Sequence, residues 1–138
     1  MQSPPPAADR IALDAPVCIT MGEPSGIGPE VAVAAFHTLR GKVGIRPLKL
    51  VGDPAVFHAC GDIPDSAIIV THPVATPRKP GAANPNNTRA VVDAIDEAVA
   101  LARNGAAAAI VTAPIHKAAL MQGGFEHAGH TQYLAELT

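Results

Sequence analysis

The sequence predicts an α/β domain in which helices flank a parallel-rich β-sheet. Short apolar runs alternate with segments of helical periodicity, the pattern of parallel strands joined by crossover helices. The composition agrees, because 48% of the residues are apolar and 3% are aromatic, which suits a buried parallel sheet packed by small-residue helices. The 138 residues are enough for one domain with a hydrophobic core.

The first half of the chain contains three predicted strands and two helices. Strands are expected at residues 16–21, 47–51 and 67–71. A helix is expected over residues 29–40, because Pro29 fits a first helical turn and Gly41 follows the last one. A short second helix is expected over residues 54–60, directly after a Gly-Asp pair.

The second half begins with a loop over residues 72–87, which are rich in Pro, Gly and Asn. Residues 88–103 are the clearest helix, with an apolar stripe of Val92, Ile95, Val99 and Ala102. The remaining elements are a strand at 107–112 and helices at 115–122 and 132–137.

Residues 1–14 are expected to be a disordered Pro-rich tail, and residues 15–138 to be one α/β unit. The net charge of -2, without a basic patch, argues against nucleic-acid binding. No apolar run has the length of a membrane span, and the N-terminus lacks the core of a signal peptide. We therefore expect a cytoplasmic protein in which Cys18 and Cys60 are reduced thiols.

The stretch "TMGEPSGIGPEV", residues 20–31, joins the first strand to the first helix. Its glycine spacing matches neither the dinucleotide fingerprint nor the phosphate loop of ATPases. Gly26 and Gly28 are expected to permit a positive φ and a close approach of the backbone. The following helix would aim free N–H groups at a ligand. A tight turn without a ligand is the alternative.

Two later stretches carry further polar residues beside the ends of elements. In "VTAPIHKAAL", residues 111–120, Lys117 is suited to an anion and His116 to acid–base chemistry, unless both are the solvated face of a short helix. In "GFEHAGHTQYLAE", residues 124–136, His130 and Thr131 precede a helix and could hold an anion, or Thr131 could cap the helix. No metal site is expected there, because Gly129 interrupts the histidine spacing.

Strand order gives these stretches a common location. Ligands of parallel sheets collect outside the carboxyl ends of the strands. Apolar strands are followed by polar residues at Gly22-Glu23, Gly52-Asp53, Thr71-His72 and residues 112–117, so we expect these segments to converge on one crevice.

Taken together, the three stretches resemble the consecutive signatures of the 4-hydroxythreonine-4-phosphate dehydrogenase family of pyridoxine biosynthesis. The resemblance implies a fold like that of isocitrate and isopropylmalate dehydrogenases. It also implies NAD-dependent oxidation and decarboxylation of 4-phosphohydroxy-L-threonine to 3-amino-2-oxopropyl phosphate. A divalent metal (Zn, Mg or Co), held by three histidines, and a homodimer with a shared active site belong to the same expectation.

The resemblance implies roles for individual residues. His130 and Thr131 match the family's substrate-binding pair, and Thr112, His116 and Lys117 lie beside the same pocket. The loop residues expected to shape the cleft are Gly22, Glu23, Gly26 and Gly28. No catalytic residue is assigned.

The chain is much shorter than members of that family. Their metal-binding histidines, substrate-phosphate lysine and arginine, and most of the NAD pocket lie downstream of the matched region. We therefore expect an N-terminal portion that is inactive by itself, carries no metal ligands and exposes apolar surface.

Two other functions stay open. One is a related dehydrogenase for D-threonate or D-erythronate 4-phosphate, or for a carboxylated diol. The other, of a different class, is a non-catalytic anion-binding module.

Overall fold

The computed structural model describes residues 11–127 and 129–138. Residues 1–10, most of the predicted tail, lie outside the described residues. Residues 12–15 form a turn against the start of the sheet. The Arg46 guanidinium donates to the carbonyl oxygens of Ala12 and Ala15 at 2.9 and 3.1 Å.

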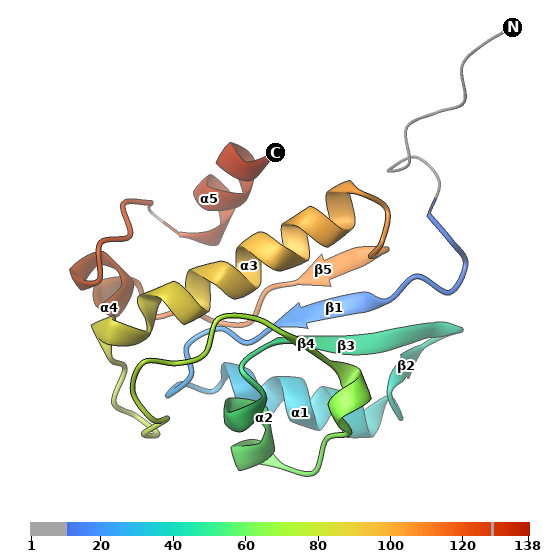
Figure 1. Cartoon of the computed structure of the whole chain (residues 1–138), viewed down its shortest axis with the longest axis horizontal. Coiled ribbons are helices and arrows are strands. Elements are labelled where there is room, and N and C mark those ends of the chain that lie inside the picture. Colours follow the sequence, from blue (N-terminus) through green and yellow to red (C-terminus); the bar gives the residue numbers. More distant parts are fainter. Residues whose placement is uncertain (1–10, 128) are drawn as a thin grey trace, which may run out of the picture.

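The order of elements follows the predicted alternation of strands and helices (Figure 1). The strands are β1 (Val17–Thr20), β2 (Lys42–Val43), β3 (Arg46–Gly52), β4 (Ile68–Val70) and β5 (Ala109–Val111). The helices are α1 (Gly28–Thr38), α2 (Pro54–Cys60), α3 (Thr88–Arg103), α4 (Lys117–Gln122) and α5 (His130–Leu137). Two short 3-10 turns, η2 (Asp65–Ala67) and η3 (Pro85–Asn87), precede β4 and α3.

Four strands form a parallel sheet in the order β4, β3, β1, β5, which confirms the predicted fold class. Val17 of the central strand β1 pairs with Leu48 of β3 on one side and with Ala109 of β5 on the other. The short strand β2 adds an antiparallel hairpin to the start of β3. The sequence analysis did not predict this hairpin, so the sheet is mixed.

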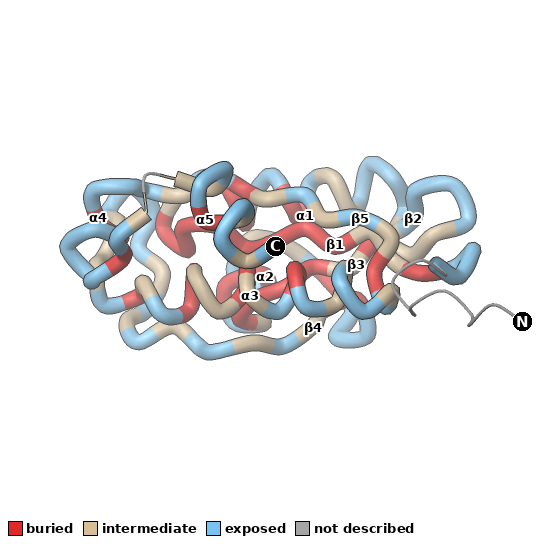
Figure 2. Tube along the Cα trace, turned by 90° about the horizontal axis from the view of Figure 1, so that it is seen from above, coloured by how far each residue is buried: buried red, intermediate tan, exposed pale blue. Residues whose placement is uncertain are grey.

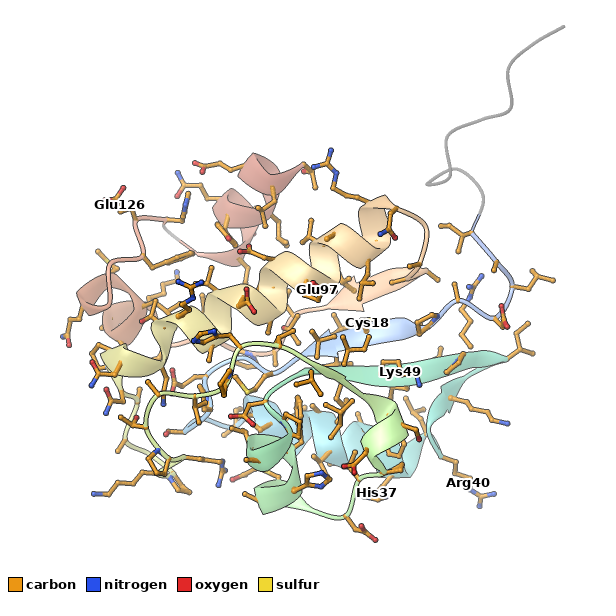
Figure 3. The ribbon with its side chains drawn as sticks, viewed as in Figure 1. Cys18, His37, Arg40, Lys49, Glu97 and Glu126 are labelled. Atoms are coloured by element: carbon orange, nitrogen blue, oxygen red, sulfur yellow. The ribbon has the colours of Figure 1, made fainter. Side chains whose placement is uncertain are left out.

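Helices cover both faces of the sheet, with α1 and α2 on one side and α3 on the other (Figure 1). Ile19 and Leu50 face α1 and α2 in the larger core cluster. Successive strand residues point to opposite faces, so Cys18 packs instead against Ala94 and Ala98 of α3. The side chain of Cys18 is labelled in Figure 3. Burial raises the pKa of its thiol to about 11, so the thiol stays protonated at neutral pH.

Helix α3 has the predicted bounds but is buried on two sides rather than along one stripe. Its second side packs against the C-terminal layer through a cluster of Val91, Ile95, Val99, Leu120, Phe125 and Tyr133. In the predicted stripe, Ile95 and Val99 are buried, whereas Val92 and Ala102 are half-buried. Figure 2 shows buried residues along the central strands and this helix, with α4 mostly exposed at one end.

Other helix boundaries differ from prediction by a few residues. Helix α1 ends at Thr38 because the chain turns left-handed at Arg40 and Gly41, with φ values of 54° and 73°. The Gly41 N–H then donates to the Phe36 carbonyl at 2.8 Å, which closes the helix end. No helix in residues 11–127 and 129–138 is long and apolar enough to cross a membrane.

Candidate functional site

The strand order creates a topological switch point between β1 and β5. After β1, the chain forms β3 and β4 on one side of β1. It then returns through α3 and forms β5 on the other side of β1. In open parallel sheets, ligands bind outside the carboxyl ends of strands at such a point. The glycine loop follows β1 and the segment 112–116 follows β5, at the end of the sheet where α4 lies (Figure 1).

The glycine loop is clamped to the segment that follows β5. Gly22 has a φ of 69°, and a Cβ there would lie 2.4 Å from the carbonyl oxygen of Pro114. The next N–H, of Glu23, donates to that same oxygen at 2.9 Å. Two segments far apart in the sequence therefore touch along their backbones, and a side chain at Gly22 would separate them.

The glycine that adopts a positive φ is not one of those expected to do so. Gly22 has the positive φ, whereas Gly26 and Gly28 do not, so that prediction was wrong for both. Gly28 still permits a close approach, because a Cβ there would lie 2.7 Å from the Met21 carbonyl oxygen. At Gly26 a Cβ would make ordinary contact, 3.4 Å from the Glu23 Cβ.

Glu23 is a buried carboxyl group, with 4% of its surface exposed. One carboxylate oxygen, Oε1, accepts the Ser25 N–H at 3.2 Å. Burial raises the pKa of Glu23, and the Ser25 N–H and the nearby His116 oppose that rise. This group contributes to the interior of the site as well as shaping its floor.

The exposed His116 lines the same hollow as Glu23 and caps α4. Its Nδ1 accepts the Ala119 N–H at 3.1 Å, so a neutral ring carries its proton on Nε2. Both side chains border a hollow of about 230 Å³ at the switch point. The other lining residues are Ser25, Gly26, Ile27, Gly81, Ala83, Pro114 and Ile115.

The third wall of the hollow comes from the loop 72–87, which the sequence analysis gave no functional role. Ser25 holds this loop, since its Oγ accepts the Lys79 N–H at 3.0 Å and its carbonyl accepts the Gly81 N–H at 2.8 Å. Arg78 also donates to Glu30 of α1 at 2.6 Å. The Gly and Pro content predicted a loop here, but it could not show which segment the loop covers.

Lys117 connects the segment 112–117 to the start of α5. A Cβ at Gly129 would lie 3.2 Å from the Lys117 Cε and 3.6 Å from its Nζ. The pKa of His130 is lowered, first by burial and then by the charge of Lys117. The buried His130 Nε2 has no hydrogen-bond partner within the described part of the chain.

The two threonines occupy more peripheral positions. Thr112 is half-buried, one residue beyond the end of β5. Thr131 is exposed on α5, whose N-cap is Gly129, so Thr131 does not cap the helix as one interpretation had it. The structure thus brings the glycine loop to His116, and Lys117 to His130, with the segment 112–117 joining both ends.

No three His, Cys, Asp or Glu side chains gather in a metal-binding group within residues 11–127 and 129–138. His127 is instead 3.2 Å from Glu136 and packs against the rings of Phe125 and Tyr133. The three metal-binding histidines that the family resemblance implies are expected downstream of the matched region.

Besides a hollow of about 240 Å³ beside α2, two larger hollows lie away from the glycine loop. One of about 350 Å³ lies between the start of α3 and the Gly123–Phe125 segment. The other, of about 390 Å³, is an apolar groove between α3, α5 and β5. We favour the hollow of about 230 Å³ as the site because it lies at the switch point and contains a buried carboxyl group.

Comparisons with known proteins agree with the fold. A 4-hydroxythreonine-4-phosphate dehydrogenase of Roseobacter denitrificans is 46% identical over 137 residues, covering 89% of this chain and 41% of the relative. A solved 4-hydroxythreonine-4-phosphate dehydrogenase of Klebsiella pneumoniae superposes with a TM-score of 0.71 at 29% identity, covering 90% of this chain and 44% of that one. A Bradyrhizobium diazoefficiens protein, named as a candidate D-threonate 4-phosphate dehydrogenase, is 34% identical over 88% of this chain and 41% of its own length.

This chain therefore spans about two fifths of the length of the curated relatives that it matches. The model of one family, the pyridoxal phosphate biosynthetic protein PdxA, matches residues 29–138. That region contains most of the α/β unit, including the segments that follow β5 and open α5. The chain belongs to the pyridoxal phosphate biosynthetic protein PdxA family.

Proposed function

We propose that this chain supplies the N-terminal α/β portion of an NAD-dependent 4-hydroxythreonine-4-phosphate dehydrogenase. The observation that carries the proposal is the contact of the glycine loop with the segment after β5, together with the closeness of Lys117 to Gly129 and its charge effect on His130. Membership of the family and the names of the relatives support the same activity. The substrate would be 4-phosphohydroxy-L-threonine, and the product 3-amino-2-oxopropyl phosphate.

In this proposal, Lys117 and His130 form the anion-facing part of the wall. The Lys117 ammonium provides a point charge for the phosphate or the carboxylate of the substrate. Since burial and this ammonium lower the pKa of His130, the imidazole is neutral near pH 7. A neutral imidazole can both donate and accept a hydrogen bond, and Thr131 and Thr112 would add hydroxyl groups nearby.

The cofactors of the complete enzyme would be NAD, which accepts the hydride, and a divalent metal, which stabilises negative charge on oxygen. The metal would be Zn, Mg or Co. Its ligands would come from outside the described residues, so no step is assigned to it here.

A cytoplasmic homodimer completes the proposal. Exposed apolar residues support a larger assembly, because Ile27, Val31 and Val111 are 62%, 54% and 49% exposed. Within the described residues, β5 pairs only with β1, so its other edge is open to a further strand.

The second candidate is a D-threonate 4-phosphate dehydrogenase, which the name of the Bradyrhizobium relative favours, or a D-erythronate 4-phosphate dehydrogenase. It would use the same wall of the site, because its substrate, like 4-phosphohydroxy-L-threonine, carries a phosphate, a carboxylate and at least one hydroxyl group.

The experiment is a chimera in which this chain replaces the matching region of the Roseobacter denitrificans relative. We expect reduction of NAD with 4-phosphohydroxy-L-threonine and a divalent metal. Lys117→Met should raise the KM, whereas the surface variant Asp65→Asn, far from the wall, should leave it unchanged. Turnover of D-threonate or D-erythronate 4-phosphate alone would support the second candidate instead of the first. Turnover of a carboxylated diol alone would identify a diol dehydrogenase. A folded chimera without turnover of any of these would favour a non-catalytic anion-binding module.

A further inference from the structure

The hollow at the switch point contains an unusual pair of groups that the proposed function does not use. Glu23 is 4% exposed, yet in the described part of the chain only its Oε1 has a hydrogen-bond partner, the Ser25 N–H. Its other oxygen has no hydrogen-bond partner among the described residues, and Glu23 and His116 both line the hollow. Buried carboxyl groups are normally paired with partners that offset their desolvation. A buried carboxyl group that lines a hollow, with one oxygen unpartnered in the described residues, is therefore suited to hold a polar group of a ligand.

The orientation of His116 determines what the pair can bind. Its Nδ1 is occupied by the Ala119 N–H, so the neutral ring offers an Nε2–H donor. The hollow thus presents one acceptor, on Glu23, and one donor, on His116. An anion would be repelled by the carboxylate, and an ammonium ion would find a donor where it needs an acceptor. A hydroxyl group satisfies both, because it donates and accepts at once.

The dimensions and walls of the hollow limit the ligand further. The hollow has a volume of about 230 Å³, below the roughly 300–1,000 Å³ of pockets that enclose a drug-sized ligand. Ile27, Ile115, Pro114 and Ala83 supply apolar walls. The hollow therefore fits one sugar ring or a short hydroxylated chain, and only part of a dinucleotide.

We propose that this hollow is a hydroxyl-binding subsite in which the Glu23 carboxyl group accepts a hydrogen bond from a ligand hydroxyl and the His116 Nε2–H donates one to it. Burial raises the pKa of Glu23, and a hydroxyl also suits the protonated carboxyl, because it can accept as well as donate. Two ligands carry this chemistry, the ribose of NAD and a phosphorylated hydroxy acid. The choice of these two probes rests on the proposed function, whereas the subsite rests on the geometry of the hollow.

The test is a nuclear magnetic resonance titration of the isotope-labelled 138-residue chain with NAD and, separately, with 4-phosphohydroxy-L-threonine. We expect one of the two probes to shift the His116 ring signals and the Glu23 amide signal. If the acid is the ligand, O-phospho-L-homoserine, which lacks the hydroxyl, should bind at least about tenfold more weakly, the size of a charge-assisted hydrogen bond. A shift with NAD alone identifies the ribose as the source.

Two variants test the pair itself. Glu23→Gln keeps the shape and the bond to Ser25 but loses the charge, and His116→Asn keeps an acceptor that can cap α4. Each should weaken binding about tenfold, whereas Asp65→Asn, a surface control, should not change it. The amide spectrum of each variant shows whether that variant folds. If one variant does not fold, the other variant and the comparison with O-phospho-L-homoserine test the subsite.

The proposal fails if neither probe shifts His116, if both variants bind as the unchanged chain does, or if the shifts map to the groove beside α3 instead. The titration measures binding and not turnover. A negative result would therefore remove the subsite and leave the dehydrogenase assignment to the chimera assay, while a positive result would stand even if the chimera had another substrate.

Discussion

The contact between Gly22 and Pro114 gives a sharp prediction about what holds the site together. In Gly22→Ala, the new Cβ would lie 2.4 Å from the Pro114 carbonyl oxygen and 3.0 Å from the Ala113 Cβ. The first distance is far inside van der Waals contact, and the atom it meets is backbone, which has no rotamer to change. The glycine loop must therefore move away from the segment after β5.

The magnitude can be worked out from three effects. A left-handed φ costs an L-residue about 1–2 kcal/mol. Overpacking against a fixed neighbour costs about 1–3 kcal/mol, and losing the Glu23 N–H bond to Pro114 costs about 1 kcal/mol. We expect Gly22→Ala to lower the free energy of unfolding by about 3–6 kcal/mol, a large part of the roughly 5–15 kcal/mol typical of a domain.

Two other glycines provide matched controls. Gly44 has a similar φ of 63° but no atom within 4 Å of the added Cβ, so Gly44→Ala should cost only about 1 kcal/mol. Gly26 has no positive φ, and Gly26→Ala should be within about 0.5 kcal/mol of the unchanged chain. Urea unfolding followed by circular dichroism measures all three. A cost for Gly22→Ala no larger than that for Gly44→Ala would refute the close approach between the two segments.

The remaining predictions concern individual side chains. The His130 ring should titrate below its ordinary pKa in nuclear magnetic resonance, because of burial and of Lys117; Lys117→Met should raise the midpoint, and an unmoved midpoint would place the two apart. Burial raises the pKa of Glu23, so the native state binds its proton more tightly than the unfolded state, and this carboxyl group lowers stability as pH rises above the ordinary Glu pKa. Glu23→Gln should therefore become more stable relative to the unchanged chain between pH 4 and pH 8, roughly the range above that ordinary value, in unfolding measurements; a pH-independent difference would contradict this. Asn87→Ala should cost about 2–4 kcal/mol and expose the amide of Thr76 to hydrogen exchange, since the buried Asn87 holds both the N–H and the carbonyl of that residue; unchanged exchange would show that the loop is held elsewhere. Tyr133→Phe should cost about 1–2 kcal/mol and speed exchange of the α5 amides, because it removes the hydrogen bond from the Tyr133 hydroxyl to Asp96; retained protection would mean that apolar packing alone docks α5.

Local patterns in the sequence predicted most of the fold because each has a local physical cause. The bounds of α2 and α3 agree with prediction, since a proline at the first turn opens one and an Asn-Gly pair closes the other. The hairpin of β2 and β3 was missed, because a strand of two residues is too short to show a period.

The site was predictable only in part. The alternation of strands and helices indicated that Glu23 and the segment 112–117 would border one crevice, and the backbone contact through Pro114 agrees with this. The third wall was missed because loop residues carry no pattern that names their partner, and Ser25 binds Lys79 and Gly81 across more than fifty positions of sequence.

The sequence by itself determined the order of elements, the glycine-rich turn after the first strand and the family resemblance, because propensity, periodicity and motif spacing act over a few neighbouring residues. Only the tertiary structure decided that Gly22, and not Gly26 or Gly28, takes the left-handed conformation, and that the buried Glu23 lines one hollow with His116. The φ angle and the buried fraction of these residues depend on which distant segment packs against them. Here that segment contains Pro114, after β5. That approach is fixed by packing of the whole sheet, which no local stretch of residues encodes.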